Sequence, residues 1–279
     1  MQVFGGENAE SYYDEGVTAL VKGDVTKAGQ CFNRALQLDD SFVAARHQLG
    51  KCYMRIGKVD RAAHLFRKVL AEKPDLLAAK MDLGHALLEQ GHLEEARKQF
   101  IDVVDAQPNH ARAHYGLARV AFDAGNWESA MALAMEARSR GGDHFSTLLL
   151  LGRAARLAGA DGLALESLKS ADALIEKSIE SNPDQPGGYF LRGEVAFAQE
   201  QYKSAIEYYR EADKRAEREH VYFAYGEEFT REDIRAKWGL CLQRLGDLVA
   251  ARELGRRILR RLPDHKLGQA LAELDDSEE

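Results

Sequence analysis

A 34-residue sequence repeat occurs twice between Val43 and Pro108, and this repetition constrains the fold more than any other feature of the chain. The first copy carries, in order, Leu49, Gly50, Tyr53, Gly57, Ala62, Phe66 and Pro74. The second copy carries, each 34 positions further on, Leu83, Gly84, Leu87, Gly91, Ala96, Phe100 and Pro108. A period of this length predicts an array of stacked helical units rather than a single globular core.

The spacing within the unit predicts a helical hairpin. Ala96 and Phe100 are four residues apart and therefore share one helical face. Gly91 falls where the first helix must stop and reverse, a position suited to left-handed backbone, and Pro108 prevents the second helix from continuing. Gly84 lies inside the first helix, where glycine costs roughly 1 kcal/mol relative to alanine. Its recurrence predicts that the backbones of neighbouring helices approach each other closely at this place.

The pattern resembles the tetratricopeptide repeat, in which W-x2-L-G-x2-Y is followed by A-x3-F and then by P. Arg46 and Lys80 stand where that family has tryptophan. The resemblance covers about residues 9–265 and implies an all-α, right-handed superhelical solenoid. It also implies that the first helix of each hairpin lines a concave groove, in which peptides or proteins bind.

Extending the period in both directions predicts about seven hairpins over residues 1–265. The turn glycines keep the 34-residue spacing five times in a row, at Gly23, Gly57, Gly91, Gly125 and Gly159. The steps between first-helix glycines then grow to 41 and 46 residues, from Gly152 to Gly193 and Gly239. The first excess predicts a second helix about two turns longer than the others, ending near Asn182.

The second excess is accounted for by an aromatic insert, residues 220–231. The predicted hairpins occupy about residues 9–42, 43–76, 77–110, 111–144, 145–185, 186–231 and 232–265. Residues 266–279 are expected to form a capping helix, which covers the last apolar surface of the array, and an acidic tail.

Composition narrows the classes of function. The 279-residue chain has a formal net charge of −7, which argues against general affinity for nucleic acids or anionic membranes. Cys31, Cys52 and Cys241 match neither a disulfide framework nor a metal motif. No apolar run is long enough to span a membrane, and the first residues do not resemble a signal peptide. We therefore expect a cytoplasmic protein without cofactor or metal, with a monomer as the favoured state.

No catalytic motif is present, because the sequence contains no G-x-S-x-G, P-loop, H-E-x-x-H or G-x-G-x-x-G pattern. The nine histidines are scattered, and His47, His85, His114 and His144 are separated by helical repeats rather than by metal-ligand spacings. These observations predict a noncatalytic protein, a scaffold or adaptor for protein–protein interaction.

The family resemblance also implies which side chains face the groove, one of them being the residue directly after the first-helix glycine place. In successive hairpins this residue is Val17, Lys51, His85, Arg119, Arg153, Glu194 and Leu240. Four consecutive hairpins thus offer a potentially cationic side chain at one equivalent place. Neighbouring inward places add Arg55, Arg112, Tyr115, Phe122 and Arg156.

The cations predict a groove that binds an acidic, partly apolar segment of a partner, whereas the alternative is ordinary solvated helix surface. The places that carboxylate-clamp cochaperones fill with lysine, asparagine and arginine hold other residues in this chain. A cochaperone of that design is therefore not expected.

Two further segments stand out. The aromatic insert contains Tyr222, Phe223, Tyr225 and Phe229. We expect these rings to pack onto the last hairpins, with a second partner contact as the alternative. The last hairpin carries Arg256, Arg257, Arg260 and Arg261. They predict an exposed basic helix face that is solvated or paired with the tail acids Asp275, Asp276, Glu278 and Glu279. Nucleic-acid association through these arginines is the alternative function.

Overall fold

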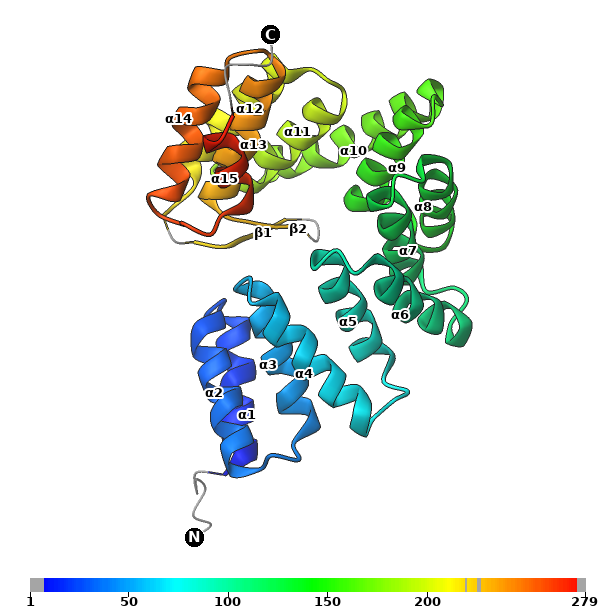
Figure 1. The fold of residues 1–279 in the computed structure, drawn as a ribbon, viewed down its shortest axis with the longest axis vertical. Helices are drawn as coiled ribbons and strands as arrows, with labels where there is room; N and C mark the ends of the chain where they lie inside the picture. The colour runs from blue at the N-terminus through cyan, green and yellow to red at the C-terminus, as the bar shows by residue number, and fades with distance from the viewer. Residues whose placement is uncertain (1–7, 219, 225–226, 275–279) are drawn as a thin grey trace. The chain divides into compact units, whose positions relative to one another are not determined.

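The structure is a computed structural model that describes residues 8–218, 220–224 and 227–274. This part of the chain contains fifteen helices, paired in sequence order as repeated hairpins, and one short β-hairpin (Figure 1). The chain divides into two compact units, of which unit 1 ends at Gly141 and unit 2 begins at Gly142.

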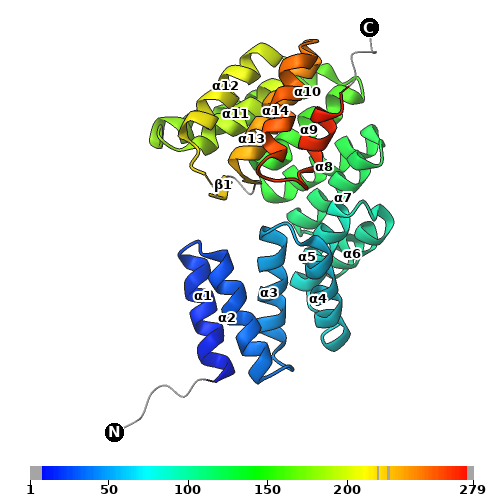
Figure 2. The same ribbon diagram turned by 60° about the vertical axis from the view of Figure 1, so that its left-hand side comes forward.

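Unit 1 is built from four helical hairpins (Figure 2). Their helices are α1 (Ala9–Val21), α2 (Val25–Leu38), α3 (Val43–Arg55), α4 (Val59–Glu72), α5 (Leu77–Glu89), α6 (Leu93–Ala106), α7 (Ala111–Asp123) and α8 (Trp127–Gly141). Each hairpin turn holds one glycine at a positive φ between 71° and 79°, at Gly23, Gly57, Gly91 and Gly125. The predicted left-handed turns are therefore confirmed.

The glycines inside the first helices make room for an aromatic ring. A Cβ atom on Gly84 of α5 would lie 2.7 Å from the fully buried ring of Phe100 of α6, and a Cβ on Gly116 of α7 would lie equally close to it. Gly50 and Phe66 repeat this contact one hairpin earlier. The predicted approach of two backbones is wrong here, because each glycine meets a side-chain ring of a neighbouring helix.

Unit 2 contains three hairpins and a last short helix. Its helices are α9 (Phe145–Leu157), α10 (Asp161–Ser181), α11 (Pro186–Ala198), α12 (Tyr202–Arg215), α13 (Arg231–Arg244), α14 (Leu248–Leu259) and α15 (Lys266–Ala272). The predicted long second helix is confirmed, since α10 has 21 residues and Asn182 is its C-cap. Its extra turns pack on α11, where Ile179 lies against Gly188.

The aromatic insert folds into an antiparallel β-hairpin of β1 (Tyr222–Ala224) and β2 (Glu227–Phe229), with Tyr222 opposite Phe229. Phe229 is only 2% exposed and stacks on Phe190 of α11, with ring centroids 4.1 Å apart. Tyr222 stacks on Phe229, and its hydroxyl accepts a 2.6 Å hydrogen bond from the backbone N–H of Glu217.

Packing of the insert onto unit 2 is therefore confirmed for Phe229 and Tyr222. The sequence pattern did not indicate the strands, because the aromatics do not alternate with polar residues. Tyr225 lies outside the residues that the structure describes.

The last helix, α15, covers the end of unit 2. Gly255 of α14 stands at the place that holds Phe66 or Phe100 in unit 1, so the ring is missing from this hairpin. Leu271 of α15 fills the space instead, since a Cβ on Gly239 would lie against its side chain. A Cβ on Gly255 would lie 2.6 Å from the backbone nitrogen of Ala272. At this one contact the backbones of two helices do approach each other closely.

Candidate functional site

The predicted groove residues of unit 1 come from three neighbouring first helices, and we call their surface the first-helix face. Its side chains are Lys51 and Arg55 on α3, His85 on α5, and Arg112, Tyr115, Arg119 and Phe122 on α7. Helices α5 and α7 are in contact, and Arg112 and Arg119 of α7 both act to lower the pKa of the His85 imidazole on α5.

His85 is the central side chain of this face, and it is uncharged at neutral pH. Burial is the largest cause that lowers its pKa, the two arginines add to that effect, and Asp82 opposes it, with a result of about 4. The imidazole packs edge-on against Phe100, with ring centroids 5.1 Å apart. His85 therefore adds no positive charge to the face at neutral pH, and Phe100, which packs against the imidazole, contributes to its burial.

An acidic residue, Asp82, also belongs to this face, at one of the places that carboxylate-clamp cochaperones fill with other residues. Asp82 of α5 lies one turn before His85, and its Oδ2 is 2.7 Å from Nε2 of His47 on α3. The pair joins two successive first helices and is half-buried. Its sequence signal was the position of Asp82, three residues before His85 on the same helical face.

The cations of the first-helix face differ in how far they are neutralised. Burial acts to lower the pKa of Arg119, but Tyr115 and the carboxylates of Asp123 and Glu89 outweigh it and raise the pKa. Nη2 of Arg119 is 4.0 Å from Oδ2 of Asp123. Lys51 is half-exposed and Arg112 exposed, and neither has an acidic partner within the described part of unit 1. The face therefore keeps a local positive excess.

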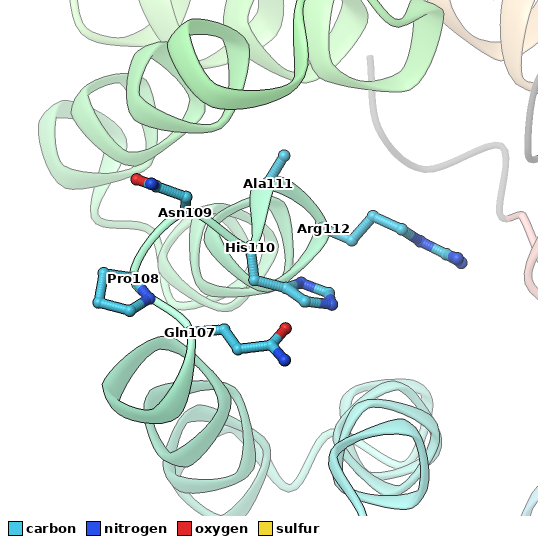
Figure 3. A pocket seen from close by; sticks show the side chains of 6 residues that line it. All are labelled: Gln107, Pro108, Asn109, His110, Ala111 and Arg112. Atoms are coloured by element: carbon cyan, nitrogen blue, oxygen red, sulfur yellow. The ribbon is translucent and has the colours of Figure 1, made fainter.

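A hollow of about 560 Å³ adjoins Arg112, and Figure 3 shows the side chains that line it. These are Gln107, Pro108, Asn109, His110, Ala111 and Arg112, from the loop between α6 and α7 and the start of α7. Nδ1 of His110 accepts a 3.1 Å hydrogen bond from the backbone N–H of Ala113 and so caps α7. Nε of Arg140 donates to the carbonyl of Pro108 at 2.9 Å, which fixes the loop.

Two predicted groove cations, Arg153 and Arg156, belong to unit 2, where carboxylates lie close to both. Nη2 of Arg156 is 3.1 Å from Oε2 of Glu200. Arg153 is exposed on α9 and helps to lower the pKa of Glu194 on α11. Of the four successive cationic places, then, three fall in unit 1 and one in unit 2.

Glu194 itself is held by a buried polar network. Its carboxylate accepts hydrogen bonds from the hydroxyl of Tyr209 at 2.6 Å and from Nζ of Lys237 at 2.8 Å. Burial acts to raise the pKa of Glu194, but Lys237, Tyr209 and Arg153 outweigh it and lower the pKa. The carboxylate is therefore ionised at neutral pH and already has its partners.

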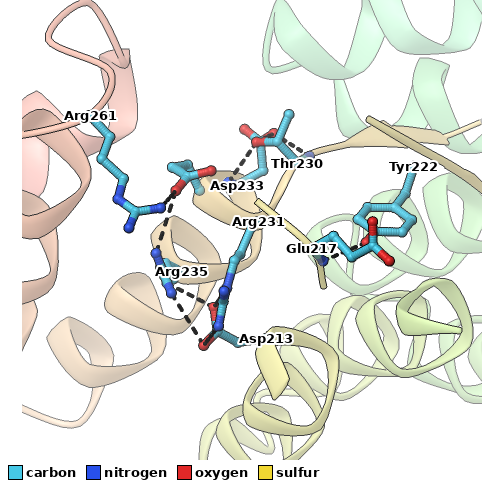
Figure 4. Close-up of polar contacts among 9 residues, drawn as sticks. Asp213, Glu217, Tyr222, Thr230, Arg231, Asp233, Arg235 and Arg261 are labelled. Atoms are coloured by element: carbon cyan, nitrogen blue, oxygen red, sulfur yellow. Dashed lines mark hydrogen bonds and ion pairs between the residues drawn. The ribbon is translucent and has the colours of Figure 1, made fainter. Parts of the chain in front are cut away.

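The basic end of unit 2 is partly a structural network, drawn in Figure 4. Its centre is the first turn of α13, where Arg231 and Arg235 both reach Asp213 of α12, at 2.9 Å and 2.7 Å. Arg261 lies 3.6 Å from Glu232 on the same turn. Of the four arginines that were predicted to form a basic face, Arg261 thus pairs with Glu232. The four tail acids that were expected to pair with these arginines lie outside the described residues.

Arg256, Arg257 and Arg260 are exposed and have no acidic partner within the described part of unit 2. Phe229 of the aromatic insert offers no open contact surface to a partner, because its ring lies in the core of unit 2. The structure describes only the backbone of Phe223.

Within the described residues, no group of three or more His, Cys, Asp or Glu side chains is arranged to hold a metal ion. The cysteines are buried and free, and burial raises the pKa of Cys52 to about 11 and that of Cys241 to about 12. Both are protonated thiols at neutral pH and therefore poor nucleophiles. No helix of the described chain is both long enough and apolar enough to cross a membrane.

The family model described as tetratricopeptide repeat matches residues 13–76, 47–91, 81–144 and 153–219. The chain therefore belongs to the tetratricopeptide repeat family, whose members are typically noncatalytic and generally act as scaffolds for protein–protein interaction. No curated protein matches the sequence.

Several solved structures resemble this one. MamA from Desulfovibrio magneticus is 22% identical with a TM-score of 0.55, over 62% of this chain and 97% of that chain. A second MamA crystal structure is 24% identical with a TM-score of 0.52, over 64% and 97%. A tetratricopeptide repeat protein from Parabacteroides merdae is 14% identical with a TM-score of 0.61, over 95% and 98%. At these identities the likeness establishes the fold alone.

Proposed function

We propose that this chain is a noncatalytic scaffold that binds an acidic, partly apolar segment of a partner protein on the first-helix face of unit 1. The observation that carries the proposal is the convergence of Arg112 and Arg119 on the uncharged His85. Two guanidinium groups beside a low-dielectric wall of aromatic core concentrate positive potential, although the chain as a whole has a net charge of −7.

The dimensions of the face suit an extended segment. Packed helices lie about 8–10 Å apart, and an extended chain advances about 3.3 Å per residue. Lys51 on α3 and Arg119 on α7 are two helix spacings apart, so acidic side chains about five to six residues apart would reach both, with His85 of α5 between them. Tyr115 and Phe122 would accept apolar side chains between them, and the segment would become ordered on binding.

His85 contributes by polarity rather than by charge. A neutral imidazole has one donor and one acceptor nitrogen and can serve a backbone amide as well as a side chain. In this proposal Arg153 and Arg156 contribute less than the unit 1 residues, because Glu194 and Glu200 compete with any acidic ligand for them.

The test is charge reversal on the face with a matched control elsewhere on unit 1. The variant Arg112→Glu/Arg119→Glu is compared with Arg97→Glu/Lys98→Glu, which makes the same change of charge on exposed α6 positions. The probe is a set of fluorescent 12-residue peptides with Asp or Glu at every third place and Leu or Phe between, read by fluorescence anisotropy.

We expect the face variant to weaken peptide binding at least tenfold, or about 1.4 kcal/mol, and the α6 variant to change it less than twofold. Equal losses in the two variants, or full affinity in the face variant, would show that the arginines are ordinary helix surface.

A further inference from the structure

The side of α1 that is equivalent to the first-helix face carries a stripe of unpartnered side chains, with Val17 at the place of Lys51, His85 and Arg119. Glu10, Asp14, Val17 and Val21 follow one another at intervals of four, three and four residues, which places them on one helical face. All four are exposed, and Val21 reaches 84%. Neither Glu10 nor Asp14 has an ion pair within the described residues. The first hairpin, residues 8–42, carries six acidic and only three basic side chains.

The outer surface of α14 carries a stripe with the same spacing and the opposite charge. Val249, Glu253, Arg256 and Arg260 are again four, three and four residues apart, and all are exposed. Val249, in the first turn of α14, is 70% exposed, a large fraction for an aliphatic side chain. Arg256, Arg257 and Arg260 make this side of α14 basic, although residues 245–279 as a whole carry six basic and eight acidic side chains.

Laid antiparallel, the two stripes match over about three turns of helix. Glu10 lies opposite Arg260, Asp14 opposite Arg256, and Val21 opposite Val249. The one imperfect pairing sets Val17 against Glu253, whose methylene groups can cover the valine while its carboxylate stays in water. Because a helix rises 1.5 Å per residue in both stripes, the matching intervals keep all four pairs in register.

From this complementarity we infer a contact between two copies of the chain, in which α1 of one copy packs antiparallel against α14 of a second copy. The contact is heterologous, because it joins two different surfaces, and it leaves the α14 stripe of one copy and the α1 stripe of the other unused, so further copies can add. The contact surface is small, because it consists of two helices joined by two ion pairs and one pair of valines. It is therefore a weak association, dependent on protein concentration and sensitive to salt. The monomer favoured from composition alone is then the dilute state.

The test is sedimentation velocity of the full chain at about 5–200 µM in low salt and in roughly 0.5 M salt, where ionic screening is strong. We expect the mean mass of the wild type to rise with concentration in low salt and to fall back to that of the monomer in high salt. Two variants, Arg256→Glu/Arg260→Glu and Glu10→Arg/Asp14→Arg, should each weaken self-association at least tenfold.

Mixing those two variants at equal concentration supplies the decisive arm. The acidic α1 of the first variant meets the basic α14 of the second, and the basic α1 of the second meets the acidic α14 of the first. The mixture should therefore associate about as strongly as the wild type. Arg97→Glu/Lys98→Glu, with the same change of charge on α6, should associate like the wild type, and circular dichroism should show all variants folded.

Several results would overturn the inference. The first is a wild type that stays monomeric at every concentration in low salt, and the second is a charge-reversal variant that still associates on its own. The third is a mixture of the two variants that stays monomeric, and the fourth is an α6 control that loses association as well. A monomeric wild type that binds a single-stranded oligonucleotide through Arg256 and Arg260 would assign the α14 stripe to a polyanion instead.

Discussion

Unit 1 and unit 2 use the same helical hairpin, yet their first helices present opposite electrostatic situations. In unit 1, Lys51 and Arg112 have no carboxylate partner within the described residues, and the histidine between the helices is neutral. In unit 2, the equivalent surface holds Glu194, whose carboxylate is already bound by Lys237 and Tyr209. The repeat thus determines where a side chain stands, while the neighbouring helices determine what charge it can offer a ligand.

The two units also differ in how the core connects to that surface. Phe100 fills its hairpin with a purely apolar ring. Tyr209 occupies the same place in unit 2, against Gly193, and its hydroxyl reaches out of the core to Glu194. A core change at Phe100 should therefore act through packing and through the burial of the neutral His85, whereas the core of unit 2 is hydrogen-bonded directly to a carboxylate. The chain supplies a reporter for each unit, since its two tryptophans are Trp127 in unit 1 and Trp238 in unit 2.

The largest expected loss of unfolding free energy comes from a substitution that disrupts the packing of unit 1. Phe100→Ala removes a fully buried ring that contacts both Gly84 and Gly116 and should cost roughly 3–5 kcal/mol of unfolding free energy. Since repeat stability is a sum of local units and interfaces, amide protection should fall first in α5 to α7 and last in α13 to α15. Hydrogen exchange measured by mass spectrometry checks this. Equal loss of protection in both units would contradict local coupling, and Val21→Ala is the exposed control.

The next largest loss of stability comes from a substitution that disrupts the buried polar network around Glu194 in unit 2. Lys237→Met leaves a carboxylate that is 12% exposed with Tyr209 as its remaining close donor, and it should cost about 2–3 kcal/mol at pH 7. Urea unfolding followed by Trp238 fluorescence in a Trp127→Phe background measures this loss. The double variant Glu194→Gln/Lys237→Met should recover most of the stability, because no buried charge is left unpaired.

The pH dependence of the same variant has a definite sign. The folded pKa of Glu194 lies below its ordinary value of 4.5, so in the wild type the network stabilises above pH 4.5 and loses its effect as pH falls through the lower folded pKa. Without Lys237 the folded pKa should rise, and the cost of the substitution should shrink as pH falls toward 4. A cost that stays constant from pH 7 to pH 4 would mean that Lys237 acts through packing.

The fold was largely predictable from the sequence, because Gly57, Gly91 and their counterparts mark backbone conformations that few other residues adopt. The candidate site was only partly predictable. The place of His85 followed from the repeat, but its charge depends on Phe100, Arg112 and Arg119 around it, which a one-dimensional pattern does not weigh. The partners of Glu194 were hidden for the same reason, since Lys237 is 43 residues away in sequence.

A smaller effect should separate the units by pH. The folded pKa of His85 is about 4 against an ordinary value of 6.5, so the unfolded chain takes up a proton first as pH falls. Unit 1 should therefore lose stability between about pH 6.5 and 4, by roughly 1–2 kcal/mol after allowance for partial exposure of the ring. His85→Gln, which does not titrate, should flatten this region. Urea midpoints from Trp127 fluorescence in a Trp238→Phe background measure it, and a pH slope unchanged by the substitution would contradict the assignment.

The smallest effect concerns the one hairpin turn that departs from the glycine rule. Glu200 of unit 2 has φ of 59° at the place where the other six hairpins have glycine at positive φ. A side chain costs roughly 1–2 kcal/mol in this conformation. The exposed pair of Glu200 with Arg156 returns at most about 1 kcal/mol, and glycine makes the unfolded chain more flexible by about 0.4–1 kcal/mol. Glu200→Gly should therefore be neutral to slightly stabilising, by up to about 0.5 kcal/mol. The mirror substitution in unit 1, Gly57→Glu, places a side chain at φ of 71° without that pair, and it should cost about 0.5–1 kcal/mol once the stiffer unfolded chain is included. Urea unfolding of both variants, each read by the tryptophan of its own unit, gives the comparison.

If Glu200→Gly destabilises unit 2 as much as Gly57→Glu destabilises unit 1, the contact between Arg156 and Glu200 is stronger than its exposure indicates, and unit 2 depends on charge at its turns as well as at its core.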